Sequence, residues 1–451
     1  MTGLRLRTAL AMTLGVEGLV VAVFVQRTDI AHQGLWLFCL ALPVFALAVW
    51  LLAGCRLPRH QGTLIILGAS AVLQLLAVTR APITSDDDYR YVWDAKVQLA
   101  GIDPYRYPPD APQLLPLRDE FLFPRTRCPH VIADGCTSIN RPTVHTIYPP
   151  VAEAAFVAIR VASFGGHGGH LPIQLAGALG VIAVAWLLAR RAAARDRPVW
   201  TVALWAWCPL PILEYSNAGH IDWLAVVLIV LAVSFAAARR SGLAGLLVGA
   251  AIATKLYPAI VLPALLRRRP GLVLGAASAL VAMSYLPHVL VVGRAVLGYL
   301  PGYLREEKYA SGERLLLLGS VLPHPLDALI GLLLLGLAAW VVWRRADSDA
   351  PEDGAVLMMG TALLVSTTVY GWYAGLLLAL VVMSGALEWL PTALAPTLVY
   401  LVRLDFGASP NISRAIYAVA AALALLGGLL RRRRLHLGTS GSRPRPTVRE
   451  E

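Results

Sequence analysis

Apolar runs long enough to cross a lipid bilayer recur along nearly the whole chain. A transmembrane helix needs roughly 17–25 mostly apolar residues, and these runs are continuous rather than alternating, as strands of a β-barrel would be. Hydrophobic residues make up 57% of the chain and charged residues 15%, whereas a soluble protein carries about a quarter charged residues. The sequence therefore predicts an all-α polytopic membrane protein.

Short clusters of arginine separate the apolar runs. Because Lys and Arg are enriched in cytoplasmic loops, these clusters indicate which connections face the cytoplasm. They account for the formal net charge of +12 without a nucleic-acid partner. Both termini are then cytoplasmic, and residues 81–165 form a long outer loop. The clusters are Arg5 and Arg7, Arg56 and Arg59, Arg190–Arg197, Arg239 and Arg240, Arg267–Arg269, Arg344 and Arg345, and Arg431–Arg434.

This topology predicts roughly 12–14 membrane segments. Residues 147–164 are expected as a helix in the membrane interface, within the outer loop. Residues 242–266 are expected to be broken at Lys255-Leu256-Tyr257-Pro258, which membranes tolerate only where the break lines a cavity. Residues 1–430 form one transmembrane domain, and 431–451 a basic, disordered cytoplasmic tail. Ordinary spans are expected near 8–25, 33–54, 62–80, 170–189, 198–214, 221–238, 271–291, 324–343, 354–369, 373–388, 391–402 and 412–430.

A dense acidic and aromatic cluster begins the outer loop, in the stretch SDDDYRYVWDAKVQLAGIDPY at 85–105. Asp86, Asp87 and Asp88 directly follow an apolar run, where carboxylates are costly unless they have a function. They could instead cap a helix, since Asp is favoured at that position. The functional interpretation is preferred, because the aspartates are accompanied by further polar and aromatic residues.

Other polar and aromatic residues fall on the same outer face of this topology. A site on that face has no access to cytosolic nucleotide-sugars, so an activated substrate would have to arrive in the membrane, attached to a lipid. The residues concerned are Arg141, Tyr148, His220, Asp222, Lys255, Trp372 and Tyr373.

Four sequence blocks in order carry a resemblance to a known family. They are Asp86–Arg90 with Asp94, Gly101 and Pro104; Thr146–Pro150; Pro209–Pro211 with Glu214, Asn217 and Asp222; and Lys255–Pro258 with the later Trp372 and Tyr373. The pattern resembles polyprenyl-phosphate-sugar-dependent glycosyltransferases of the C fold. It looks most like the GPI mannosyltransferase I catalytic subunit and the bacterial polyprenyl-phosphomannose mannosyltransferases.

The resemblance implies inverting transfer of a sugar, with mannose expected, from a polyprenyl-phosphate carrier to a hydroxyl of a lipid-linked glycan or glycolipid. An Asp general base takes the hydroxyl proton, and cationic groups stabilise the leaving phosphate. Asp86 is the first candidate base, Asp88 the second and Asp87 the third. Lys255 is the first candidate for the donor phosphate, followed by Arg90, Arg141 and His220. The remaining substrate-binding candidates are Tyr89, Trp93, Asp94, Tyr148, Asp222, Trp372 and Tyr373.

Several alternatives stay open at this point. No cofactor is expected, although Asp86 and Asp88 could bind a divalent cation through their oxygens. Lys255 could simply extend toward the interface, and Trp372 and Tyr373 could be interfacial anchors. The sugar could be arabinose, glucose or galactose. A secondary transporter would also have many spans and broken helices, but it should show an internal repeat, and none is evident.

Two cysteines, Cys128 and Cys136, lie in the predicted outer loop. An oxidising compartment favours their pairing in a disulfide. The bias toward Ala, Leu, Arg and Gly is typical of a GC-rich bacterial genome, so we expect a plasma-membrane protein of the cell envelope. Membrane lipids are the expected surroundings.

Overall fold

Helices make up most of the structure, a computed structural model that describes residues 3–26, 33–163, 169–306, 314–407 and 409–440. In these ranges seven helices are long and apolar enough to cross a membrane. This confirms the predicted all-helical membrane fold. The seven are α1 (Gly3–Gln26), α2 (Gly34–Gly54), α3 (Arg59–Ala77), α6 (Leu171–Ala194), α12 (Pro270–Val292) with its continuation to Glu306, α14 (Leu326–Arg345) and α18 (Pro410–Ser440).

Shorter or broken helices lie inside the bundle that these long helices form. All residues of α16 (Ala374–Ser384) are buried, whereas α12 buries only Val273 and Ala277. Irregular backbone within a membrane needs such a protein environment, because lipid cannot satisfy its polar groups. The inner elements are η3 (Val199–Val202), α7 (Ala203–Ala206), α8 (Pro209–Pro211), α9 (Asp222–Ala237), α10 (Ser241–Ile252), α11 (Leu262–Leu265), α15 (Pro351–Ser366), η9 (Gly371–Tyr373) and α17 (Leu390–Phe406).

The helix within residues 242–266 is interrupted close to Lys255–Pro258, where the sequence predicted a break. Helix α10 ends at Ile252, and the short helix η5 (Tyr257–Val261) follows. Pro258 and Pro263 supply no backbone N–H and disfavour a helical residue before them. The interruption therefore leaves Lys255 outside any helix, between two inner segments.

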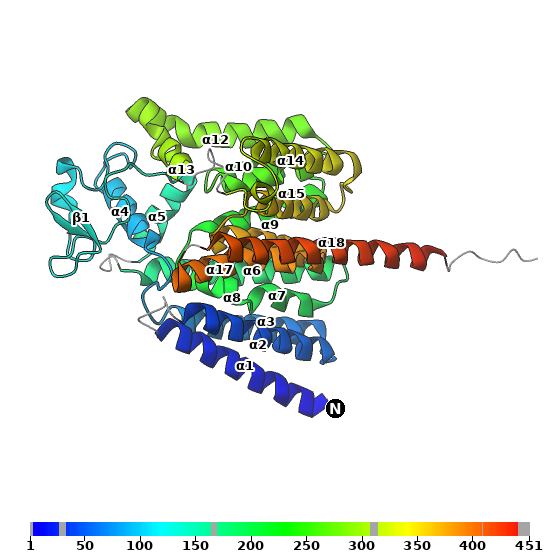
Figure 1. The fold of residues 1–451 in the computed structure, drawn as a ribbon. Coiled ribbons are helices and arrows are strands. Elements are labelled where there is room, and N and C mark those ends of the chain that lie inside the picture. Colours follow the sequence, from blue (N-terminus) through cyan, green and yellow to red (C-terminus); the bar gives the residue numbers. More distant parts are fainter. Residues whose placement is uncertain (1–2, 27–32, 164–168, 307–313, 408, 441–451) are drawn as a thin grey trace, which may run out of the picture.

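The predicted outer loop folds into a compact region, residues 85–162, at one end of the bundle (Figure 1). It contains α4 (Asp87–Leu99), η2 (Pro112–Leu117), the hairpin of β1 (His130–Ile132) and β2 (Gly135–Thr137), and α5 (Pro150–Ala162). Helix α5 corresponds to the expected interfacial helix and packs on α4, with the Phe156 ring stacked 4.4 Å from the Tyr91 ring. A disulfide joins Cys128 to Cys136 across the hairpin.

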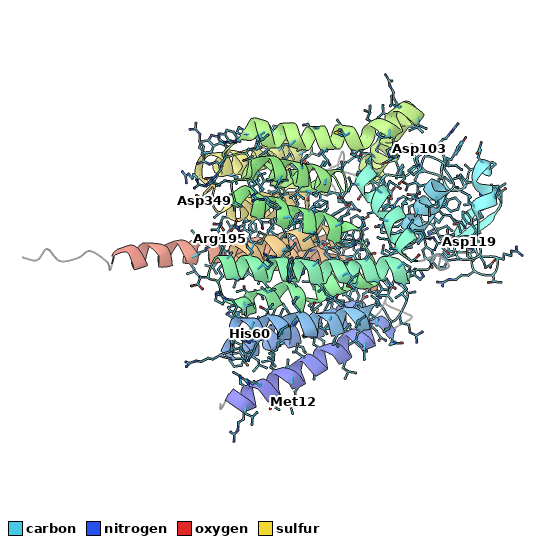
Figure 2. The ribbon with its side chains drawn as sticks, turned by 180° about the vertical axis from the view of Figure 1, so that it is seen from behind. Met12, His60, Asp103, Asp119, Arg195 and Asp349 are labelled. Carbon is cyan, nitrogen blue, oxygen red and sulfur yellow. A yellow bond between two sulfur atoms is a disulfide. The ribbon has the colours of Figure 1, made fainter. Side chains whose placement is uncertain are left out.

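The predicted cytoplasmic arginines meet at the opposite end of the bundle. Figure 2 shows His60, Arg195 and Asp349 at that end, far from Asp103 and Asp119. Arg268 and Arg239 pair with Asp349, and Arg191 pairs with Glu352 at 2.9 Å. The start of α1 lies at this same end, and α18 runs toward it (Figure 1). The arginine-bearing loops therefore lie together at one end of the bundle, as the arginine pattern predicted.

The C-terminal helix is longer than the sequence suggested. Helix α18 continues to Ser440, into the segment 431–451 that we expected to be a disordered tail. The apolar residues of α18 end near the arginine run, but Arg and Leu are themselves good helix formers. Residues 441–451 lie outside the described residues.

A π-helical turn, η4 (Ile212–Asn217), is hydrogen-bonded to the chain segment that leads from α3 to α4. Asn217 donates from Nδ2 to the Ala77 carbonyl at 3.0 Å and accepts from the Ile83 N–H at 3.1 Å. Gln174 on α6 donates to the Asn217 carbonyl at 2.7 Å and to the Arg80 carbonyl at 2.8 Å. These bonds fix the connection that delivers the aspartates.

The close approach of α6 to η4 generates a stability prediction. A Cβ at Gly177 would lie 1.8 Å from the Tyr215 carbonyl oxygen. We expect Gly177→Ala to lower the free energy of unfolding by about 1–3 kcal/mol, the usual cost of overpacking, in thermal unfolding of detergent-purified protein. Gly68→Ala is the control, because nothing lies within 4 Å of its added methyl group. Equal stability of the two variants would contradict the close packing.

Candidate active site

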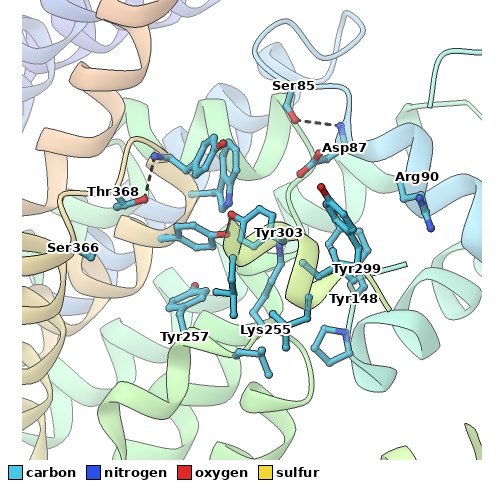
Figure 3. Close-up of a pocket in the computed structure, with 18 of the residues that line it drawn as sticks. Ser85, Asp87, Arg90, Tyr148, Lys255, Tyr257, Tyr299, Tyr303, Ser366 and Thr368 are labelled. Carbon is cyan, nitrogen blue, oxygen red and sulfur yellow. Dashed lines mark hydrogen bonds between the residues drawn. The ribbon is translucent and has the colours of Figure 1, made fainter. Parts of the chain in front are cut away.

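A cavity of about 840 Å³ lies between the α4–α5 region and the inner helices. Its polar wall comes from the start of α4 and the chain before α5, with Ser85, Asp86, Asp87, Asn140, Arg141 and His145. A second wall is aliphatic and comes from η5, α13 (Leu300–Glu306), α14 and α15, with Ile260, Leu300, Leu304, Leu335, Met359 and Leu363. Figure 3 shows Asp87, Lys255 and several tyrosines around this cavity.

Two of the three aspartates face the cavity where α4 begins: Asp86 precedes the helix and Asp87 is its first residue. Asn140 donates its two amide N–H groups to Asp86 Oδ1 at 2.8 Å and to Asp87 Oδ1 at 2.7 Å. The other Asp86 oxygen lies 3.1 Å from His130 Nε2, on the hairpin. The other Asp87 oxygen accepts no hydrogen bond from the described residues, and its nearest ionic partner is His220 Nε2 at 3.9 Å.

Asp88 points away from the cavity. It is fully buried, and one of its oxygens accepts from His170 Nδ1. Burial raises the pKa of this carboxyl, which His170 partly offsets. One residue advances the direction of a helical side chain by about 100°, so consecutive aspartates cannot all face one cavity. Asp88 therefore does not line the cavity beside Asp86 and Asp87, and its roles as second candidate base and as cation ligand with Asp86 stay predictions.

Lys255 reaches the cavity from the break after α10. Its ammonium lies 3.3 Å from Asp222 Oδ2 and 4.9 Å from the centre of the Tyr148 ring. The Lys255 side chain is 12% exposed, whereas Asp222 is fully buried. Asp222, predicted to bind substrate, thus lies behind the lysine and positions it. Such a charged pair needs good geometry to offset its desolvation.

Arg90 lines the cavity, but its guanidinium is bound on both sides by protein. Its Nε lies 3.0 Å and 3.1 Å from the two Asp94 oxygens, and both terminal nitrogens lie 3.2 Å from the Val144 carbonyl. Its side chain is buried. Arg90 therefore holds the wall at Val144, and phosphate binding by Arg90 and substrate binding by Asp94 stay predictions.

A second buried carboxylate completes this network. Glu153 on α5 accepts from Thr146 Oγ1 at 2.9 Å and from Gln98 Nε2 at 2.8 Å. Burial, and then the neighbouring Asp94 charge, raise the pKa of Glu153 well above its ordinary value of 4.5. The network ties α4 and α5 to the segment that ends at Tyr148, whose ring faces Lys255.

Arg141 lies on the cavity wall and is paired with the end of α13. Its Nε is 3.0 Å from both Glu306 oxygens, and the Tyr299 hydroxyl donates to the same carboxylate at 2.8 Å. The pair is partly exposed. The hydrogen bond from Arg141 lowers the pKa of Glu306. Arg141 remains close enough to the cavity to meet an anion, in competition with Glu306.

The aromatic candidates divide between the cavity and the protein interior. Tyr148, Trp372 and Tyr373 line the cavity. Tyr89 instead packs against Phe121 and His170, and Trp93 packs against Phe123. Tyr89 and Trp93 thus pack within the α4–α5 region, and substrate binding by all five aromatic residues stays a prediction.

His220 is fully buried beneath the polar wall and does not line the cavity, and its role at the donor phosphate stays a prediction. Its Nε2 lies 3.1 Å from Ser85 Oγ, and its Nδ1 lies 2.9 Å from the Glu214 carbonyl and 3.3 Å from Glu214 Oε2. The ring stacks on Trp372 with 4.0 Å between centroids.

Some lining residues were not assigned from the sequence. Asn140, Tyr257, Tyr299, Tyr303, Tyr370 and Tyr400 all contribute to the cavity. Asn140 stands in the NRP turn of the predicted outer loop, which was a usable signal. The tyrosines come from four separate segments, and nothing in their local sequence separates them from interfacial anchors.

In the described ranges, no group of three or more His, Cys, Asp or Glu side chains converges as a metal site, and the divalent-cation alternative stays a prediction. Asp86 and Asp87 are bridged by the Asn140 amide instead. An N–H donor stands between the carboxylates, where an oxygen-bound cation would be expected to lie.

The family comparison supports glycosyl transfer. Residues 146–367 match the family model described as Glycosyltransferase family 87. No curated protein and no solved structure matches the chain. The matched segment includes Tyr148, Asp222 and Lys255, and it lies after the three aspartates. Glycosyl transfer by a multi-pass membrane protein is thus supported, and the resemblance to GPI mannosyltransferase I stays a prediction.

Amide substitutions of the two buried carboxyl groups, Asp94 on α4 and Glu153 on α5, should change the stability of the protein in different ways. Because the folded-state pKa of Glu153 is raised, its stabilising effect is complete below about pH 4.5 and is lost as pH rises. Glu153→Gln should therefore flatten the fall in thermal stability with rising pH. Asp94→Asn should cost about 3–5 kcal/mol, because it leaves Arg90 buried without its carboxylate. A larger loss for Glu153→Gln than for Asp94→Asn would overturn this assignment.

Proposed function

We propose that this protein transfers mannose from a polyprenyl-phosphate carrier to a hydroxyl of a lipid-linked glycan or glycolipid, with inversion at the anomeric carbon. The observation that carries the proposal is the position of Lys255. Its ammonium lies on a cavity that has two carboxylates on one wall and aliphatic side chains on the other. A lipid phosphate sugar has the same order of parts: an apolar chain, an anionic phosphate and a polar sugar.

The donor would bind with its prenyl chain along Leu300, Leu304 and Leu335, and its phosphate at Lys255. Asp222 fixes the lysine from behind at 3.3 Å, and the Tyr148 ring lies beside it. This support matters because a lysine side chain is otherwise flexible. The sugar would extend toward Asp86 and Asp87.

In the reaction, the acceptor hydroxyl would lose its proton to Asp87 while its oxygen attacks the anomeric carbon. The bond from that carbon to the phosphate oxygen breaks, and the phosphate leaves with its added charge stabilised by Lys255. We assign the base role to Asp87 because one of its oxygens accepts no hydrogen bond within the described residues, whereas both Asp86 oxygens have partners. Asp86 is the second candidate.

The cellular placement belongs to the same proposal. The α4–α5 region and the cavity would face the outer side of a bacterial plasma membrane, with the arginine end and both termini in the cytoplasm. The disulfide between Cys128 and Cys136 supports this placement, because such bonds persist in oxidising compartments.

Reconstitution of the purified protein tests the proposed reaction. Proteoliposomes would receive polyprenyl phosphates carrying mannose, glucose, galactose or arabinose, together with a membrane extract as acceptor. We expect transfer from the mannose carrier. Transfer from another carrier would keep the reaction and change the sugar, whereas movement of the carrier across the bilayer without sugar transfer would favour a transporter.

Asp87→Asn should lower the transfer rate by about 10²–10⁴-fold, the usual contribution of a general base. Asp119→Asn is the matched control: Asp119 pairs with Lys96 at the surface of the same region. The measurement is the initial rate at saturating donor. If Asp86→Asn abolishes transfer and Asp87→Asn does not, the base is Asp86.

Lys255→Met should lower the transfer rate by about 10²–10³-fold, as expected when one preorganised electrostatic group is removed from a transition state. Asp222→Asn should have a smaller effect, since it disturbs the position of the ammonium without deleting it. Lys96→Met is the control for loss of a lysine. A parent-like rate for Lys255→Met would argue against phosphate binding at this residue.

A further inference from the structure

His220 occupies a position that sugar transfer alone does not explain. It is fully buried and lies behind the cavity wall, yet each of its ring nitrogens faces an acceptor. Nδ1 lies 2.9 Å from the Glu214 carbonyl oxygen and 3.3 Å from Glu214 Oε2. On the opposite side, Nε2 lies 3.1 Å from Ser85 Oγ and 3.9 Å from Asp87 Oδ2.

We propose that His220 is a protonated positioning residue, which together with Glu214 holds a positive charge behind the Asp87 carboxylate for catalysis. The proposal rests on the proposed function for the identity of the reaction that Asp87 serves. The protonated state of the ring does not depend on that function.

The hydrogen-bond pattern fixes a proton on Nδ1 and is compatible with a doubly protonated ring. A neutral imidazole has one N–H donor and one acceptor nitrogen. The Glu214 carbonyl and carboxylate oxygens can only accept, so Nδ1 carries an N–H. Ser85 Oγ accepts the backbone N–H of Asp87 at 3.2 Å, and its hydroxyl can either donate to Nε2 or accept from it at 3.1 Å.

The charges around the ring favour the same state. Glu214, Asp87 and Asp222 all act on His220, and Asp222 already has Lys255 as a partner at 3.3 Å. Within the described ranges, Glu214 forms its ion pair with His220. Burial lowers the pKa of His220, but the Glu214 hydrogen bond and the carboxylate charges outweigh it, so the pKa is raised above 6.5.

Two packing features hold the pair in place. The Trp372 ring stacks on the imidazole with 4.0 Å between centroids and a 28° angle between planes, an arrangement in which an aromatic face attracts a cation. Gly371 makes room for Glu214, because a Cβ there would lie 2.2 Å from Glu214 Oε1. The 370–373 turn thus serves both the cavity surface and the buried charge.

The first test measures the ring itself. Protein labelled with ¹⁵N-histidine and held in lipid nanodiscs would be titrated by NMR, with the His220 signals assigned by their loss in His220→Gln. Should that variant not fold, the signals would be assigned by the shift change in Trp372→Leu. We expect a doubly protonated ring at pH 7.5 that becomes neutral in Glu214→Gln. A neutral ring in the parent protein overturns the proposal.

The second test measures the pH dependence of sugar transfer. Asp87 loses its positive neighbour in His220→Gln, so the acid limb of the rate profile should move to higher pH by about one unit, with the donor KM unchanged. An unmoved limb, with a uniformly lower rate, would show a purely structural role and overturn the proposal. Transfer that is absent from the parent while the ring is protonated would overturn the proposed function instead.

Discussion

Irregular backbone inside a membrane must be covered by protein, and this constraint organises the whole structure. The π-helical turn η4 and the break before η5 both interrupt regular α-helix, which a lipid-exposed segment does not tolerate. They lie within a shell of long helices; η4 carries Glu214, the break carries Lys255, and His220 lies between η4 and α9. The features that make these segments poor membrane helices bring charged side chains next to a cavity.

The charges at the cavity are arranged in pairs across element boundaries. Lys255 pairs with Asp222 from α9, His220 with Glu214 from η4, and Asp86 contacts His130 from the hairpin. Each pair joins segments that are distant in sequence or separated by a helix end. Buried charges of this kind are favourable only when their partners are fixed. The packing of the bundle is therefore also what determines the electrostatic field at the proposed reaction centre.

Much of the fold could be predicted from sequence, because hydropathy and the position of arginines constrain helices directly. The break at Lys255–Pro258 and the interfacial helix both followed from the need to keep all arginine clusters on one side. The site was predicted less well. Whether Asp87 or Asp88 faces a cavity depends on the residue at which α4 begins, and sequence locates helix ends only to within about two residues. Likewise, Asp222 and Lys255 could be recognised as polar partners, but not which of them would be covered by the other.

Helix α16 has a consequence for how the protein is assembled. All of its side chains are buried among other helices, and its 11 residues extend only about 16 Å at 1.5 Å per residue. The hydrocarbon core of a bilayer is about 30 Å thick, so this helix cannot be stable as an isolated span in lipid. Its stability in the bilayer depends on the neighbours that cover it, such as α6, α9 and α15. The centre of this membrane protein thus holds a segment that could not span the bilayer alone.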